Sequence, residues 1–126
     1  MTTNEIILII ALTLWGECRG EPLEGQTAVA SVIYRRGNGN PERMADACLR
    51  PRQFSCWNPG GVTLADRTRI QEPQLALARQ MAEGLFTPVI NADHYHAASI
   101  NPYWTADMEK VAEIGNHIFY SSKRRW

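Results

Sequence analysis

The stretch LWGECRGEPLEGQTAVA, residues 14–30, decides the fold because it joins two predicted apolar helices through a short polar junction. Before it, Thr2 and Glu5 stand three residues apart, and this capping-box spacing predicts the start of a first helix. The glycines of the stretch predict that this helix ends near residues 17–19. Its apolar face is formed by side chains at helical spacing: Ile6, Ile7, Ile10 and Leu14, with Ile9 and Leu12 beside them.

A second helix is predicted after the junction. Pro22 is well placed as its first residue, and it runs to about Arg36. The turn residues GNGN at 37–40 end it. Small side chains at Ala28 and Ala30 allow another backbone to approach closely, so we expect this helix at the centre of the core.

The remaining segments predict two further helices and little sheet. A third helix is expected over residues 40–49, followed by an irregular loop or a short hairpin at 51–61. A fourth helix is expected over 73–83, then an extended segment over 89–96. Residues 111–120 fit either a strand pair turning near Gly115 and Asn116 or the end of a helix. The fourth helix is predicted to bury Leu75, Ala78, Ala82 and Leu85, with Gly84 as its C-cap. We therefore predict an α+β fold that is mainly helical with a small irregular β portion.

Length and charge limit the class of protein. A chain of 126 residues without a repeat or a linker fits one domain. Lys and Arg together number 13, as do Asp and Glu, so the formal net charge is zero. This balance argues against a general nucleic-acid binder, which needs a basic face. It also argues against a protein held on polyanions or membranes by bulk charge.

Cysteine usage and hydropathy give further expectations. Cys18, Cys48 and Cys56 are odd in number and no two are spaced as CxxC, so we expect free thiols or at most one bridge. No run of about 18 apolar residues occurs, so we expect no transmembrane helix. The apolar N-terminal run lacks a basic flank, so we interpret it as a buried helix and expect no signal peptide.

The densest polar cluster lies in WGECRGEPLEGQ, residues 15–26. A carboxyl at the end of a buried helix is partly desolvated, and desolvation favours the protonated form that a general acid needs. Glu17 fits this position best. Glu21 and Glu24 flank the start of the second helix, where the dipole favours ionised carboxylates, so we interpret them as helix-start residues. A purely structural junction of caps and surface pairs is the alternative, and Gln26 is a candidate for pointing into a cleft.

A second cluster is HYH at 94–96, followed by the aromatic pair of NPYW at 101–104. On a strand, His94 and His96 point to one side and Tyr95 to the other. We interpret these residues, with Tyr103, as the lining of a groove. A zinc site needs a third ligand, and ordinary strand residues around a core tyrosine are the other alternative.

A third cluster is QFSCWN at 53–58. Aromatic rings cover the apolar faces of sugars and amides pair with sugar hydroxyls, so the loop is a candidate sugar-binding surface. The alternative is a loop that folds back onto the core. Cys56 is also a candidate nucleophile for acyl transfer, whereas Cys18 and Cys48 are expected to be inert buried thiols.

The segment KRRW at 123–126 is a basic and aromatic tail. We interpret it as a contact for anionic wall polymers or lipid, with a frayed, solvated end as the alternative.

Four blocks of the chain resemble the spore-cortex-lytic type of cell wall hydrolases. Residues 14–30 are similar to that family's opening pattern, roughly E-A-R-G-E-P-x-x-G-Q-x-A-V-A. QFSCW at 53–57 resembles its phenylalanine-containing loop, and HYH at 94–96 and IGNHIFY at 114–120 resemble its two closing motifs. The resemblance spans nearly the whole chain. It departs at Cys18, where the family often has alanine; both are small, so we expect no loss of activity.

The resemblance implies a lysozyme-like fold of the lytic transglycosylase group and bacterial peptidoglycan as substrate. It implies that Glu17 protonates the oxygen between N-acetylmuramic acid and N-acetylglucosamine and that the sugar's own 6-hydroxyl then forms a 1,6-anhydro product. We expect no metal and no cofactor. The residues predicted to bind the glycan strand are Gln26, Phe54, Ser55, Trp57, His94, Tyr95, His96 and Tyr103.

Several alternatives to this chemistry stay open. A hydrolytic muramidase with two carboxylates needs a partner about 5 to 9 Å from the acid. Glu24, Asp46, Asp66 and Asp93 are candidates, and no motif marks any of them. A cell-wall peptidase or amidase using zinc or Cys56 is a second alternative, and a non-catalytic glycan-binding module is a third.

The biological setting is predicted from the same resemblance. The family includes spore-germination and phage lysis enzymes, and a short chain without a wall-binding domain or export signal is more similar to a phage endolysin. We expect a single catalytic domain over residues 1–126, acting as a monomer on glycan strands. We expect no nucleic-acid partner and no stable membrane insertion. The expected location is the host cytoplasm before release to the wall, or the virion.

Overall fold

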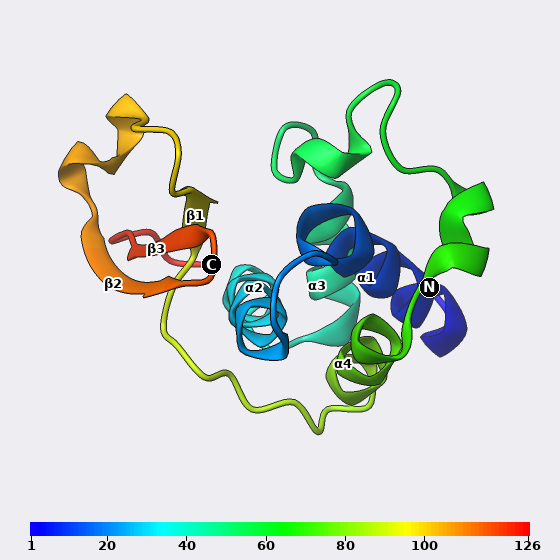
Figure 1. The fold of residues 1–126 in the computed structure, drawn as a ribbon. Helices are drawn as coiled ribbons and strands as arrows, with labels where there is room; N and C mark the ends of the chain where they lie inside the picture. Colours follow the sequence, from blue (N-terminus) through cyan, green and yellow to red (C-terminus); the bar gives the residue numbers. More distant parts are fainter.

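Four α-helices pack on one side of the molecule and three short strands form a sheet on the other (Figure 1). A computed structural model describes all residues, 1–126. The helices are α1 (Thr3–Cys18), α2 (Leu23–Arg36), α3 (Pro41–Leu49) and α4 (Glu72–Ala82). Three 3-10 helices are η1 (Ser55–Trp57), η2 (Leu64–Arg69) and η3 (Tyr103–Asp107), and the strands are β1 (His94–Ala97), β2 (Glu109–Ile114) and β3 (His117–Ser121). The predicted α+β class, mainly helical with a small β portion, is confirmed.

Helix α1 is packed on several sides by other elements. It begins at the predicted capping box, in which the Glu5 backbone N–H donates to Thr2 Oγ1 at 3.1 Å. Ile10, Leu12 and Leu14 are all without exposed surface because the other three helices and η1 pack around α1. No helix of the protein combines the length and the apolar character needed to cross a bilayer.

Helix α2 connects the helices to the sheet. It begins one residue after the predicted position, because Pro22 is its N-cap, and it ends at Arg36 as expected. Its small residues Ala28 and Ala30 are fully buried. Helix α2 contacts α1, α3, α4 and two strands. The predicted central position of α2 is confirmed.

The sheet has the strand order β1-β3-β2, and both pairs are antiparallel. Tyr95 pairs with Phe119 in β3. Gly115, with a φ of +57°, helps to form the turn between β2 and β3, so the strand pair is the correct alternative for residues 111–120. A long connection from α4 to β1 runs along the bottom of Figure 1.

The predicted buried face of α4 is confirmed only at Ala78, because Leu75 and Ala82 are half-buried and Leu85 is exposed. The buried residues are Gln74, Leu77, Ala78 and Met81, whereas Leu85 is 71% exposed. Helix α4 ends at Ala82, and Gly84 turns the chain with a φ of +75°, so Leu85 no longer continues the helical face. Phe86 enters the core in its place.

A pair of truncations tests this reassignment. Leu77→Ala is expected to lower the free energy of unfolding by about 2–5 kcal/mol, because it leaves a cavity in the core. Leu85→Ala is expected to change it by less than about 0.5 kcal/mol. Equilibrium denaturation measures both, and a larger loss for Leu85→Ala would contradict the observed face of α4.

Candidate active site around Glu17

Glu17 lies in the last turn of α1, and its carboxylate receives hydrogen bonds from two distant segments. The Cys56 backbone N–H donates to Oε2 at 2.9 Å, and Ser55 Oγ lies 3.4 Å from the same oxygen. The Tyr95 hydroxyl donates to Oε1. One half-buried carboxylate therefore joins α1, η1 and β1.

The loop around η1 is pinned tightly against α1. A side chain at position 16 would place its Cβ 2.6 Å from Cys56 Cβ, so only glycine allows this approach. The Trp57 indole N–H donates to Thr13 Oγ1 at 2.9 Å, and Phe54 is buried in the core. These contacts hold the Cys56 backbone N–H in position to donate to the Glu17 carboxylate.

Tyr95 approaches Glu17 from the sheet. Its ring packs against His117, with the ring centroids 5.0 Å apart, and against Phe119 at 5.6 Å. Burial and the nearby Glu17 carboxylate raise the pKa of the Tyr95 hydroxyl well above its usual value. The hydroxyl therefore stays protonated and acts as a donor to Glu17.

A pocket of about 280 Å³ lies beside Tyr95, and Glu17 is not among the residues that line it. Tyr95 lines the pocket and also bonds to Glu17. The pocket combines hydrogen-bonding side chains with an aromatic wall, the features that orient a polar ligand with apolar faces. Its lining residues are Arg36, Arg52, Gln53, His94, Tyr95, Trp104 and Met108.

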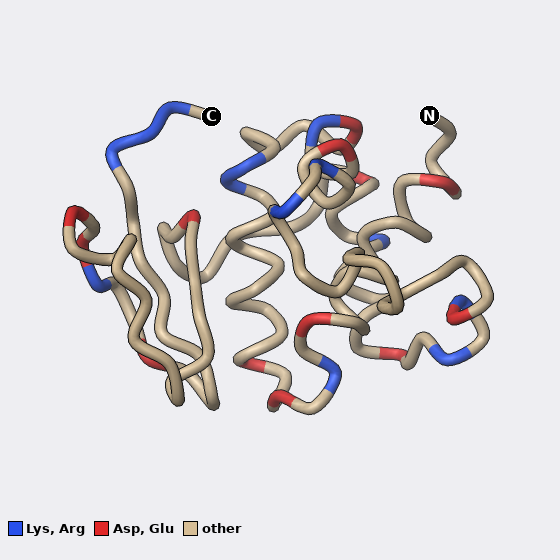
Figure 2. The backbone as a smooth tube through the Cα atoms, turned by 90° about the horizontal axis from the view of Figure 1, so that it is seen from above, with Lys and Arg blue, Asp and Glu red and all other residues tan.

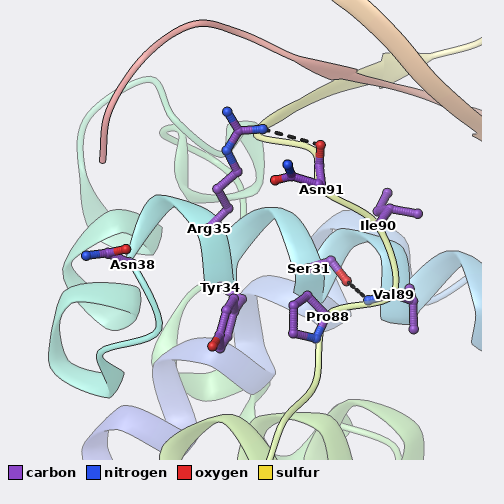
Figure 3. Close-up of a pocket in the computed structure, with 8 residues that line it drawn as sticks. All are labelled: Ser31, Tyr34, Arg35, Asn38, Pro88, Val89, Ile90 and Asn91. Carbon is purple, nitrogen blue, oxygen red and sulfur yellow. Dashed lines mark hydrogen bonds between the residues drawn. The ribbon is translucent and has the colours of Figure 1, made fainter.

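A different pocket of about 410 Å³ lies between α2 and residues 88–91 (Figure 3). It holds none of the predicted site residues. The guanidinium of Arg35, on its wall, is already bonded to Asn91 O, Ser121 Oγ and Ser122 O. The pocket beside Tyr95 fits the predicted site better, because His94 and Tyr95 both line it.

Four of the predicted glycan-binding residues come together near Glu17. Ser55 and Tyr95 contact its carboxylate, whereas Phe54 and Trp57 pack beneath the loop. The loop therefore folds back onto the core, as the second alternative predicted, and it also donates to Glu17, while its role as a sugar-binding surface stays a prediction.

The other four predicted residues do not contact the Glu17 carboxylate. They are Gln26, His94, His96 and Tyr103. Gln26 is only 4% exposed, and its amide bonds to Gln74 and to the Glu21 carbonyl inside the core. His96 is buried with its Nε2 2.9 Å from the Tyr120 hydroxyl. Tyr103 is 92% exposed and makes no contact with Glu17.

His94 lines the pocket beside Tyr95, and its Nδ1 lies 3.0 Å from Asp93 Oδ1. Sequence reasoning missed the Cys56 backbone N–H, Arg36 and Arg52. A backbone donor has no side-chain signature. Arg36 is typical of the basic last turn of a helix, so nothing in its spacing indicated a pocket.

The interpretation of Glu21 as a helix-start carboxylate is wrong. Its Oε1 accepts the Asn116 backbone N–H at 2.7 Å, and its Oε2 accepts Asn116 Nδ2 at 3.0 Å. A side chain at position 115 would place its Cβ 2.6 Å from Glu21 Oε1, so Gly115 permits this contact. Glu21 ties the β2–β3 turn to the junction between α1 and α2.

All three thiols are free, as expected. Burial raises the pKa of the Cys18 thiol, and raises that of Cys48 to about 12, so both are inert as predicted. Burial and the Glu17 carboxylate also raise the pKa of the Cys56 thiol. Its Sγ lies 3.9 Å from the Thr13 carbonyl, so the structure does not support a Cys56 thiolate nucleophile. No group of three or more His, Cys, Asp or Glu side chains is arranged to hold a metal ion.

The chain belongs to the Cell Wall Hydrolase family, which it matches over residues 20–120. The spore cortex-lytic enzyme of Oceanobacillus iheyensis is 32% identical over 116 residues, which cover 90% of this chain and 40% of that protein. The Bacillus subtilis spore cortex-lytic enzyme is 29% identical over 120 residues, 93% of this chain and 38% of that protein. The chain thus spans about two fifths of the length of these relatives.

Solved structures share the fold over most of the chain. The catalytic domain of the germination-specific lytic transglycosylase SleB from Bacillus anthracis has a TM-score of 0.73 and 29% identity, covering 93% of this chain and 94% of that one. The catalytic domain of the Bacillus cereus SleB protein has a TM-score of 0.68, 27% identity and coverages of 94% and 91%. The predicted family and lysozyme-like fold are confirmed. The family match begins at residue 20 and does not include Glu17. The role of Glu17 is therefore argued from the geometry of its contacts.

The half-buried His117 predicts a loss of stability in mild acid. Burial lowers its pKa below 6.5, and the Glu21 and Glu17 carboxylates offset this only in part, with His96 adding to the lowering. The unfolded chain therefore binds more protons below about pH 6.5, and the free energy of unfolding falls as the pH drops through that value. His117→Asn is expected to flatten this dependence between pH 7 and 5 in denaturation experiments. Near pH 8 the histidine is neutral in both states, so the difference between the variant and the parent there reports the packing change alone. If the free energy of unfolding of the variant falls with pH as steeply as that of the parent, the assignment to His117 is refuted.

Proposed function

We propose that this chain cleaves the bond between N-acetylmuramic acid and N-acetylglucosamine in bacterial peptidoglycan, as a lytic transglycosylase. The observation that carries the proposal is the Glu17 carboxylate, held by donors from η1 and β1, one of which, Tyr95, also lines a polar and aromatic pocket. The family match and the shared fold of the SleB catalytic domains support the same substrate class.

Glu17 performs both proton transfers in this reaction. In its protonated form it gives its proton to the glycosidic oxygen as the bond from that oxygen to the muramyl C1 breaks. The three donors then stabilise the new carboxylate next to the developing positive charge on the sugar. The muramyl 6-hydroxyl forms a bond to C1 and returns its proton to Glu17, which leaves a 1,6-anhydro end.

The other carboxylates named in the sequence are engaged elsewhere. Asp93 is fully buried and accepts hydrogen bonds from Ser122 and the Trp126 indole. Asp66 caps η2 through the Thr63 backbone N–H. Glu24 is exposed at the start of α2, and Asp46 lies in a pocket lined by arginines. None of them shares a hydrogen-bond partner with Glu17, which favours the mechanism with one glutamate over the two-carboxylate muramidase.

Glu17→Gln tests the proposed acid directly. The amide keeps the shape of the side chain but cannot give up a proton, so clearing of a purified wall suspension is expected to slow by about 10²–10⁴-fold. Glu24→Gln carries the same chemical change on the exposed start of α2 and is expected to retain the parent rate. Parental clearing by a folded Glu17→Gln protein would sink the proposal.

Tyr95→Phe tests the hydrogen bond to the catalytic carboxyl. Its loss is expected to reduce kcat about tenfold with little change in KM, because the donor acts on Glu17 rather than on substrate binding. The matched control is Tyr120→Phe, whose hydroxyl contacts His96 and not Glu17. Equal rates for the two variants would remove Tyr95 from the mechanism.

A further inference from the structure

A second polar pocket, of about 300 Å³, shares Arg36 with the pocket beside Tyr95. It joins the end of α2 and helix α3 to the C-terminal tail. We call it the arginine pocket, and it is lined by Arg36, Arg43, Asp46, Arg50, Arg124, Arg125 and Trp126.

The charge of the arginine pocket is unbalanced. Five guanidinium groups line it with one carboxylate. None of the five forms an ion pair with a carboxylate, whereas Arg35 pairs with Asp93 and Arg69 with Asp66. Since the whole chain has zero net charge, positive charge is concentrated at this site.

Arg36 is the buried member of the pocket and is only 8% exposed. Its Nε donates to the Asp93 carbonyl at 2.8 Å, and its Nη1 to Gln53 Oε1 at 3.2 Å, so its acceptors are neutral. Its Nη2 makes no hydrogen bond within the protein. The Arg36 guanidinium forms no ion pair of its own, and an anion in the pocket would supply a charged partner for it.

The C-terminal tail is folded onto this site, in place of the frayed end that the sequence allowed. The Trp126 indole donates to Asp93 Oδ2 at 2.9 Å, and the Arg124 guanidinium lies 3.9 Å from the centre of the Trp126 ring. The Arg36 guanidinium lies 5.0 Å from the centre of the Phe54 ring and 5.6 Å from the centre of the same Trp126 ring. The basic residues of the tail form the continuous blue stretch beside the C-terminus in Figure 2. The tail therefore contributes fixed charges to the pocket.

We propose that the arginine pocket binds the carboxylates of the acidic peptide stem carried by the muramyl sugar. The proposal rests on the function proposed above, because the sugar whose bond breaks also carries this peptide. Arg36 lines both pockets, so a sugar bound in the pocket beside Tyr95 would place its attached peptide on the side of Arg36 where the other arginines lie. Guanidinium groups bind carboxylates through paired N–H donors, which suits a peptide with several free carboxylates.

Binding to two forms of one wall preparation tests this proposal. One form has free stem carboxylates, and in the other they are converted to amides with carbodiimide and methylamine. Binding is measured by co-sedimentation at low salt in the Glu17→Gln background, so that the wall is not digested. The protein is expected to bind the free-carboxylate form about tenfold more tightly.

The test variant is Arg50→Gln/Arg124→Gln/Arg125→Gln, which changes only exposed members of the pocket and leaves the buried Arg36 in place. Its matched control is Arg67→Gln/Arg69→Gln/Arg79→Gln, with the same change in charge on exposed residues outside the pocket. The test variant is expected to lose the preference for free carboxylates, and the control to keep it. In the active protein the same triple change is expected to raise KM on the free-carboxylate wall while kcat stays within about twofold.

The outcomes separate this proposal from the function itself. Equal binding of the parent to both wall forms, or equal losses in the test and control variants, would overturn the peptide-stem proposal. Binding that is lost when phosphodiester polymers are stripped from the wall, and not when carboxylates are amidated, would assign the pocket to phosphate instead. Carboxylate-dependent binding without digestion by the active protein would contradict the proposed function while the binding result stands.

Discussion

The hydrogen bonds to Glu17 fix the position of the sheet and the η1 loop relative to helix α1. Its carboxylate is the meeting point of α1, the η1 loop and strand β1, which are separated by 39 and 78 positions in the chain. Hydrogen bonds to a charged group contribute about 1.5–3 kcal/mol each, so this arrangement stabilises the junction strongly. The geometry exists only because Gly16 lets the loop approach the end of α1.

Two glutamates four residues apart in the chain tie the helices to the sheet. Glu17 receives the Tyr95 hydroxyl of β1, and Glu21 receives two donors from Asn116 at the β2–β3 turn. Between them the Tyr95 ring packs against His117. The polar junction in residues 14–30 thus fixes the position of the sheet and, through Tyr95, the surroundings of the proposed acid. Structure and chemistry depend on the same short stretch of sequence.

The helix boundaries could be predicted because their signals are local. Thr2 and Glu5 begin α1, and Asn40 and Pro41 begin α3, as the sequence indicated. The face of α4 could not be predicted as well, because helical spacing does not show that the chain leaves the helix before Leu85. The net charge of the chain could not predict the arginine pocket either. The net charge is zero, yet five arginines without ion pairs line one pocket.

The site was predictable where its chemistry lies in side chains. Glu17, Ser55 and Tyr95 stand in motifs whose residue types suggest catalysis or sugar binding, and the structure brings them together. The Cys56 backbone N–H has no such signature, and its position follows from the packing of the loop. Gln26 has a polar side chain suited to a ligand, but Gln74 from α4 occupies its amide inside the core. Such long-range partners are set by tertiary packing and not by spacing in the sequence.

The central claim is that Glu17 alone carries both proton transfers and that the muramyl 6-hydroxyl is the nucleophile. Mass spectrometry of the sugar ends released from purified peptidoglycan tests it most directly. The account predicts anhydro-muramyl ends, each lighter by one water than a hydrolysed end. Release of reducing muramyl ends alone would show that water is the nucleophile and would contradict the account.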